Sequence, residues 1–405
     1  MGYNKSNIPL LVYTVKLAAL ATLAAATGAF AQSSVTIFGT FDPSVQNQKV
    51  TYGSGTSVSN NFIGNNGQGT SQITFKGVED LGGGLKASFL LENDFNARFD
   101  ANGPEGVSAV GVRGTNFGVY GGEQYLALEG GFGKIAAGAA NTPSLTAQAS
   151  RQPFGTKIGS GFNGVLGTGH VRSNNSLVYS TPAFSGFSAA FAYGFKHNAQ
   201  ATPGTGAVAQ ANTNTGAAAT ASTNDANQTS VSDIGVNYAN GPFAAGLSMW
   251  TTDAVTSVAL ATTPKTTQTN LYASYDLGVA KIAGGYHTEK QVAYTSSARP
   301  AGANAEGFNI AATIPLSGSL SLLANYAKLD DKLSTRAAAP LNKTISAIGV
   351  KYTLSKNTSI YARYVDEKNE NVAAAIAANL VSSTATAGNT AAGVKTTLIG
   401  MQTNF

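Results

Sequence analysis

The 405-residue sequence contains no cysteine, which excludes disulfide scaffolds, thiolate metal sites and cysteine nucleophiles. The same absence suits a chain that crosses an oxidising compartment before it folds, because no thiols can mispair there. Charged residues make up only 11% of the chain, against roughly 25% in ordinary soluble proteins. This scarcity argues against a soluble enzyme with a charged surface, a coiled coil and a charge-rich disordered protein. After the N-terminus, no apolar run reaches the roughly 18 residues that a membrane-spanning helix needs.

The balance of charges is only mildly basic. The chain has 25 lysines and arginines and 20 aspartates and glutamates, for a formal net charge of +5. No group of basic residues forms the dense patch that marks a nucleic-acid interface. We therefore expect no nucleic-acid partner.

Residues 1–31 have the features of a cleaved export signal. They contain two lysines and no acidic residue, and 17–26 is a largely apolar stretch rich in leucine and alanine. Ala29-Phe30-Ala31 then gives the small-x-small pattern of a signal peptidase site. The alternative, a membrane anchor, is disfavoured because the apolar run is short and ends in small residues. We therefore expect 1–31 to be removed and 32–405 to form a single domain.

The rest of the chain alternates apolar residues with polar or small ones at a period of two. Segment 187–194 is one example, and 348–354 is another. Because successive side chains of a strand point to opposite faces, each such segment has one apolar face. Sixteen segments fit the pattern. They are 33–45, 71–78, 84–92, 122–129, 132–139, 173–180, 186–194, 231–239, 242–250, 268–276, 279–287, 305–314, 319–328, 344–354, 358–366 and 394–405.

Two all-β architectures accommodate such strands. In a soluble sandwich the apolar faces form a core, whereas in a membrane barrel they face lipid and the polar faces line a wet lumen. Aromatic residues near strand ends, such as Tyr193, Tyr275 and Tyr352, and an alternation of short and long connections favour the barrel. The expected long connections are 46–70, 93–121, 140–172, 195–230, 251–267, 288–304 and 368–393. The sequence thus predicts an all-β fold, a 16-stranded antiparallel transmembrane β-barrel.

Four blocks of sequence carry a family resemblance. They are 32–39 (QSSVTIFG), 75–87 (FKGVEDLGGGLKA), 172–182 (RSNNSLVYSTP) and the terminal Phe405, with Met401 and Ile399 before it on one strand face. Together they resemble the trimeric general porins of Gram-negative outer membranes, in the beta-proteobacterial and neisserial branch. Block 75–87 and the terminal phenylalanine are the most specific parts.

The resemblance implies a homotrimer of barrels in the outer membrane, each with a third loop that folds into the barrel and narrows it. It implies passive diffusion of small hydrophilic solutes and ions, with no cofactor. It further implies that the barrel assembly machinery recognises the terminal strand with Phe405. Lipid and lipopolysaccharide are the expected surroundings.

The charge pattern around the third loop suggests a preference for anions. We expect the infolded loop at 140–172, and the chain has no acidic residue between Glu129 and Asp225. A ring of one sign in a narrow pore attracts counter-ions and repels co-ions. We therefore expect a basic constriction. Its candidate residues are Arg151, Lys157, Arg172 and Lys134; the alternative is that some of them lie in subunit contacts or point to bulk water.

Strand parity adds two candidate residues on the lumen wall. Lys76 alternates with Phe75, and Arg363 alternates with Tyr364, so both are expected to face inward. Several wall positions lack the arginine that is usual in the family, for example Gln72 in the second strand. The anion preference is therefore expected to be mild.

We expect no enzymatic activity. The chain has only three histidines, His170, His197 and His287, all in or beside expected loops, where a solvated side chain is the simplest interpretation. Two other functions stay open. A substrate-selective channel would show saturable block by one solute, and an adhesin or structural barrel would show no conductance.

Overall fold

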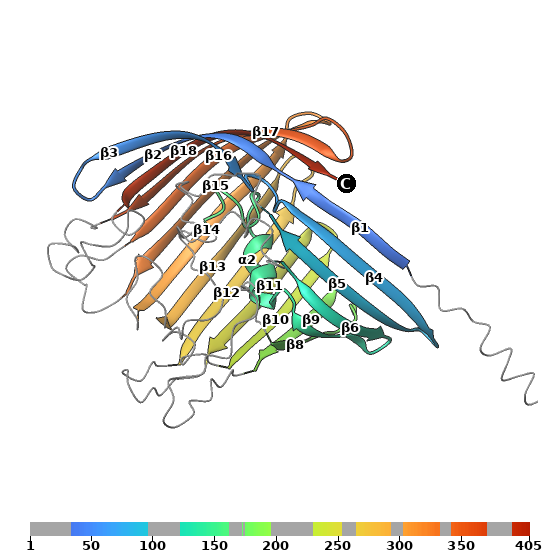
Figure 1. Cartoon of the computed structure of the whole chain (residues 1–405). Helices are drawn as coiled ribbons and strands as arrows, with labels where there is room; N and C mark the ends of the chain where they lie inside the picture. Colours follow the sequence, from blue (N-terminus) through green and yellow to red (C-terminus); the bar gives the residue numbers. More distant parts are fainter. Residues whose placement is uncertain are drawn as a thin grey trace, which may run out of the picture.

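The computed structural model describes residues 34–95, 122–161, 172, 175–195, 230–252, 265–292, 303–332, 342–370 and 391–405. The expected export signal, 1–31, lies outside these residues. The described strands are β1 (Ser34–Phe41), β2 (Pro43–Tyr52), β3 (Ser57–Asn65), β4 (Gln72–Gly82), β5 (Leu85–Asp94), β6 (Gln124–Gly130), β7 (Gly133–Ala139), β8 (Ser176–Ser180), β9 (Phe187–Gly194), β10 (Val231–Asn240), β11 (Phe243–Thr252), β12 (Thr266–Asp276), β13 (Lys281–Val292), β14 (Ala303–Pro315), β15 (Leu320–Asp331), β16 (Lys343–Thr353), β17 (Thr358–Asn369) and β18 (Ala391–Asn404). Among the described residues one helix, α2 (Pro143–Ser150), is present, and it lies inside the curved wall (Figure 1).

These 18 segments form one closed antiparallel sheet. The first strand of the barrel is β1 followed by β2, interrupted at Asp42, and the second is β3 followed by β4, interrupted at 66–71. β1 and β2 both pair with β18, and this pairing closes the ring. The described segments therefore make a 16-strand antiparallel barrel, as the sequence predicted.

The expectation of a long loop at 46–70 is wrong. β2 and β3 form a hairpin, and its turn is closed by a hydrogen bond from the Tyr52 N–H to the Thr56 carbonyl (2.8 Å). The strand pattern was hidden because this hairpin carries polar residues on both faces; the outward side of β2 includes Asn47 and Lys49. Such a hairpin suits strands that extend beyond a lipid bilayer into water. The other expected long connections, apart from the start of 140–172, lie mostly outside the described residues.

The outer face of the wall is apolar. On β18 Ile399 and Met401 are 65% and 50% exposed, whereas Leu398 just before them points inward and is 1% exposed. Near one end of the barrel, Tyr238 contacts Phe187 and Phe243, with ring centroids 4.5 and 6.2 Å away. Apolar bands edged by aromatic rings are typical of barrels that face lipid. In the described part of the chain, no helix is long and apolar enough to cross a bilayer.

The C-terminus lies in the seam that closes the barrel. The Gly39 N–H donates to the Phe405 carbonyl (2.9 Å), and the Phe405 N–H donates to the Gly39 carbonyl (3.1 Å). The Phe405 ring lies over Gly39, where a Cβ atom would come within 2.6 Å of the ring Cζ and 2.3 Å of the Gln72 carbonyl oxygen. Only glycine leaves space for the terminal ring at this position.

Replacing Gly39 with alanine is therefore expected to destabilise the folded barrel by about 1–3 kcal/mol, the usual cost of overpacking a tight contact. Urea unfolding followed by the fluorescence of Trp250 measures this change. Gly131→Ala is the matched control, because a Cβ there meets nothing within 4 Å. Equal midpoints for the two variants would contradict a tightly packed seam.

Candidate functional site

The chain between β7 and β8 enters the barrel and begins with α2. The helix is capped by Thr142, whose hydroxyl accepts from the Leu145 N–H (3.3 Å), and Pro143 occupies its first turn. The Ser144 N–H and hydroxyl donate to the Asp233 carboxylate on β10, at 2.9 and 2.8 Å. These bonds fix the start of the third loop to the inner wall.

The tip of the loop rests on an apolar patch of the inner wall. Phe154 is buried and packs with residues of the strands opposite, and the half-buried Ile158 packs against the same cluster. The wall members are Ala305, Leu323, Ala327, Leu329, Ile345, Ala347 and Val365. Strand alternation predicted a more polar or small face toward the lumen, and the structure shows that this face also carries large apolar side chains where the loop covers it. Where a loop covers the inner wall, burial favours apolar side chains as it does in any core.

Three polar side chains of the wall also hold the loop by its backbone carbonyls. Asn309 on β14, Asn325 on β15 and Arg363 on β17 are all buried and all donate hydrogen bonds to the loop. The acceptors are the carbonyls of Arg151 (2.9 Å), Gly159 (3.0 Å) and Ile158 (2.9 Å), in that order. Arg363 is also stacked between aromatic rings, 4.6 Å from the centroid of Phe154 and 5.1 Å from that of Tyr361.

A second segment, 66–71, turns toward the third loop at the interruption of the second strand. The buried Asp42 carboxylate accepts hydrogen bonds from the N–H groups of Gln68 (2.5 Å) and Gly69 (2.6 Å), and from the Tyr361 hydroxyl (2.5 Å). Arg363 donates to the carbonyl of Gly67 as well as to the loop. We call 66–71 the inner turn. It was not predicted from the sequence, although Asn65-Asn66-Gly67-Gln68-Gly69 is a turn-forming run.

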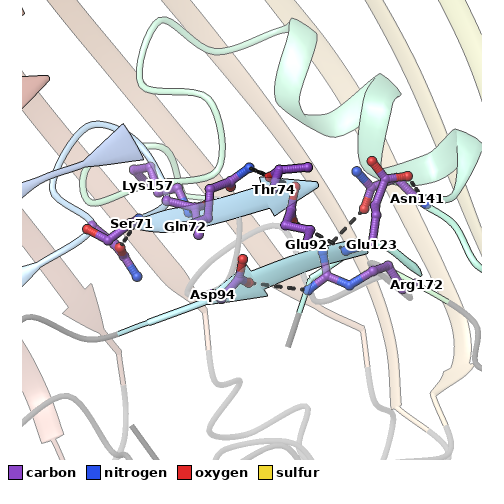
Figure 2. Close-up of polar contacts among 11 residues, drawn as sticks. Ser71, Gln72, Thr74, Glu92, Asp94, Glu123, Asn141, Lys157 and Arg172 are labelled. Carbon is purple, nitrogen blue, oxygen red and sulfur yellow. Dashed lines mark hydrogen bonds and ion pairs between the residues drawn. The ribbon is translucent and has the colours of Figure 1, made fainter. Parts of the chain in front are cut away.

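Charged side chains meet where the third loop faces β5 (Figure 2). A carboxylate oxygen of Asp94 lies 3.7 Å from a guanidinium nitrogen of Arg172, which also donates to the Asn141 side chain (3.3 Å). Glu92 accepts from the Gln72 amide (2.7 Å), and Glu123 accepts from the Asn141 N–H (2.7 Å). Glu92, Asp94 and Glu123, which we call the acidic trio, thus lie near the loop. They were not predicted, because the acid-free stretch that suggested a basic constriction begins only after Glu129.

Lys157 extends from the loop toward the inner turn. Its ammonium donates to the Thr70 hydroxyl. Figure 2 shows Lys157 near Ser71 and Gln72. Burial lowers the pKa of Lys157, and the nearby carboxylates of Asp94 and Asp42 oppose this shift. Lys157 and Arg172 are therefore the two predicted constriction residues that the structure brings near the acidic trio.

The other predicted residues lie elsewhere. Arg151 ends α2 and is fully buried against Gly285; it donates to the Tyr286 carbonyl (3.4 Å), and burial lowers its pKa to about 10. Lys134 follows the turn between β6 and β7. It donates to the Tyr125 hydroxyl (2.7 Å) and lies 3.8 Å from the Glu129 carboxylate.

The predicted wall residues both share the inward parity of their strands. Lys76 is exposed and lies on the same face of β4 as Thr74, and Arg363 donates to the Ile158 carbonyl of the loop. The prediction that His287 is a solvated loop residue is wrong. It lies in β13, fully buried, with its ring nitrogens 2.6 Å from the Asn270 side-chain oxygen and 2.8 Å from the Glu289 carboxylate. Inward parity within a longer strand explains its burial.

Known proteins are similar to this chain in both sequence and architecture. The family model described as Gram-negative porin matches residues 17–372. Outer membrane porin protein 32 of Delftia acidovorans is 31% identical over 370 residues, which cover 87% of this chain and 89% of that protein. The major outer membrane protein P.IB of Neisseria gonorrhoeae is 35% identical over 131 residues, 32% of this chain and 33% of that protein.

A solved structure extends the likeness to the whole barrel. The anion-selective porin from Comamonas acidovorans has a TM-score of 0.63 and 25% identity, and the alignment covers 92% of this chain and all of that one. A family match over most of the sequence, a relative that spans it and a closed 16-strand barrel with an infolded loop agree with one another. The chain therefore belongs to the Gram-negative porins and forms a general diffusion channel of the outer membrane.

Proposed function

We propose that this porin is a passive channel with a mild preference for anions, and that its third loop and inner turn form the selective constriction. Lys157 and Arg172 are the basic groups nearest the constriction in this proposal. Arg151 and Lys134 contribute to the potential from farther away, and Lys76 and Arg363 contribute from the wall. The relative from Comamonas acidovorans is an anion-selective porin, which supports the same preference here.

One observation carries the proposal. Within the described residues, Arg151, Lys157 and Arg363 have no carboxylate within 4.0 Å, so their positive charges are not neutralised by an ion pair. Charges in a narrow space bounded by low-dielectric walls act more strongly on a passing ion than they do in bulk water. The resulting potential favours chloride and small organic anions.

The acidic trio explains why the preference is mild. Asp94 lies 3.7 Å from Arg172 and offsets much of its charge, and Glu92 and Glu123 place two more carboxyl groups near the loop. Hydrogen bonds from Gln72 and Asn141 hold these two carboxylates in place. The constriction thus combines basic groups on the loop with acidic groups on β5 and just before β6.

Neutralising the acidic trio is expected to strengthen the anion preference. In the variant Glu92→Gln, Asp94→Asn, Glu123→Gln, the ratio of chloride to potassium permeability should rise about threefold, because only basic groups remain at the constriction. Reversal potentials under a KCl gradient in planar bilayers measure the ratio. Arg172→Gln should shift the potential in the opposite direction.

Glu306→Gln is the control, since Glu306 is exposed and lies 3.6 Å from Lys332. A cation-preferring wild type, or a triple variant that matches the control, would overturn the assignment of the constriction. The absence of any conductance would favour a structural barrel or adhesin instead.

We further propose that the chain acts as a homotrimer among outer-membrane lipid and lipopolysaccharide, passes small ions and solutes, and has no catalytic role. Recognition of Phe405 by the barrel assembly machinery belongs to the same proposal. The resemblance to trimeric general porins supports it. Mass measurement of the native detergent complex tests the trimer, and the outer-membrane yield after deletion of Phe405 tests the assembly signal.

A further inference from the structure

A polar recess opens between the third loop, the inner turn and the wall of β2, β16, β17 and β18. Its volume is about 370 Å³, near the lower end of the range of small-molecule pockets, which runs from about 300 to 1,000 Å³. The residues that matter for its chemistry are Gln46, Gln48, Asn66, Lys157, Glu367 and Thr396. We call this site the wall recess.

The wall recess contains one acidic side chain that lacks a hydrogen-bond donor. Glu367 lies on β17 two residues beyond Val365 and four beyond Arg363, so the alternation of the strand turns it inward with them. No described residue donates a hydrogen bond to its carboxylate, and the positive charge of Lys343 on β16 acts on it only from beyond ion-pair distance. A partly buried carboxylate without a donor is costly unless a solute or water supplies one. Glu367 is therefore suited to receive an ammonium group.

The wall recess also contains one basic side chain with free donor capacity. The Lys157 ammonium has three N–H donors, and its contact with the Thr70 hydroxyl uses one of them. The carboxylates of Asp94, Asp42 and Glu92 act on the charge of Lys157 at longer range, but none of them lies within ion-pair distance of it among the described contacts. Lys157 can thus bind a carboxylate that enters the wall recess.

Amide and hydroxyl groups line the space around these two charges. Gln46 and Gln48 lie on the inner face of β2, and Thr396 lies opposite Gln48 on β18. The recess also includes Asn66 of the inner turn and the loop backbone from Thr156 to Gly161. Such groups both donate and accept hydrogen bonds, so they suit a polar solute of either charge without selecting one sign.

We infer that the wall recess is a binding site for small zwitterions, of the class of free amino acids, whose ammonium pairs with Glu367 and whose carboxylate pairs with Lys157. A simple anion is attracted by Lys157 and repelled by Glu367, and a simple cation is attracted by Glu367 and repelled by Lys157. Only a molecule that carries both charges forms a favourable ion pair with each residue. The inference needs the chain to conduct ions but does not depend on its anion preference.

Binding should appear as excess noise in the ion current, because a solute beside the constriction transiently obstructs it. The probes are glycine, β-alanine and γ-aminobutyrate, which differ in the distance between their two charges. Butyrate and butylammonium, which carry one charge each, are the control solutes. Saturable noise is expected from at least one zwitterion, and much weaker noise is expected from butyrate or butylammonium alone. Glu367→Gln and Lys157→Gln should each weaken the apparent affinity about tenfold, the usual effect of losing one charge-assisted hydrogen bond.

Asp366→Asn is the matched control, because the neighbouring residue faces the other side of β17 and lies 3.9 Å from Lys395. Gln48→Trp is a second test, since it fills the wall recess without removing a charge and should abolish the noise. The inference is overturned if butyrate alone matches the zwitterions, or if the Glu367, Lys157 and Gln48 variants all bind like the wild type. KCl conductance and reversal potential in the same bilayers show separately whether each variant still forms the channel.

Discussion

Replacing Arg363 with methionine is expected to turn a steady channel into one whose conductance fluctuates. Arg363 is the only described side chain that donates both to the third loop, at the Ile158 carbonyl, and to the inner turn, at the Gly67 carbonyl. Its loss leaves two carbonyls without their donor, at about 1–3 kcal/mol each. The loop should therefore detach from the wall at least about tenfold more often, since 1.4 kcal/mol corresponds to a factor of ten.

Single-channel recordings at constant voltage measure this effect as the frequency of transient conductance changes. Lys351→Met is the matched control, because Lys351 has the same inward parity on β16 but no described contact with the loop. Both variants remove one positive charge from the inner face. A change in ion selectivity that both variants show is therefore due to the lost charge and not to the lost contacts with the loop. If Arg363→Met is as quiet as the control, Arg363 does not hold the loop.

Asn325→Leu should show a weaker form of the same behaviour. Asn325 donates to the carbonyls of Gly159 (3.0 Å) and Ser160 (3.2 Å), but the apolar patch around Phe154 remains intact. Loss of these bonds loosens only the tip of the loop. An ordered series, with Arg363→Met noisier than Asn325→Leu, would support a loop held by several wall contacts together.

Strand alternation predicted the barrel because the bilayer imposes it. Lipid requires an apolar outer face over the whole membrane thickness, so residues such as Ile399 and Met401 recur at every second position regardless of what lies inside. The surroundings of the inner face differ from place to place. Lys76 faces water, Ala347 packs against the third loop, and Tyr361 contacts the inner turn. The alternation of apolar and polar residues therefore predicts where the strands lie, but it does not predict which side chains line the lumen.

The charged cluster beside the third loop could be predicted only in part for a related reason. Arg172 and Lys157 were predicted because they lie in the loop whose inward fold the family resemblance implies. Glu92 and Asp94 lie on β5, about 60–80 residues earlier, and come near them through the pairing of β5 with β6 and of β6 with β7, the strand before the loop. Which wall residues face a loop depends on its path across the lumen, and that path is set by contacts such as Ser144 with Asp233. The spacing of residues along the sequence does not predict these contacts.

Asp42 is the residue whose loss is expected to destabilise the barrel most. Its carboxylate is fully buried and accepts from two backbone N–H groups, of Gln68 and Gly69, and from the Tyr361 hydroxyl. It lies where the first strand is interrupted, so it joins the first, second and fifteenth strands of the barrel at one point. In Asp42→Ala all three donors lose their acceptor. The expected cost is on the order of 4 kcal/mol, because each buried donor left unpaired costs about 1–3 kcal/mol.

Urea unfolding followed by the fluorescence of Trp250 measures this cost, with Asp80→Ala as the control. Asp80 accepts one hydrogen bond, from the Gly82 N–H in an exposed turn (2.9 Å), so its replacement should cost less than about 1 kcal/mol. Asp42→Asn separates charge from shape. Its amide oxygen can accept from the Gln68 and Gly69 N–H groups while its amide N–H donates to the Tyr361 hydroxyl, so it should restore most of the stability that alanine loses. If asparagine restores most of the stability, hydrogen bonding rather than negative charge holds the inner turn in the lumen. If it destabilises the barrel as much as alanine, the negative charge of the carboxylate is required.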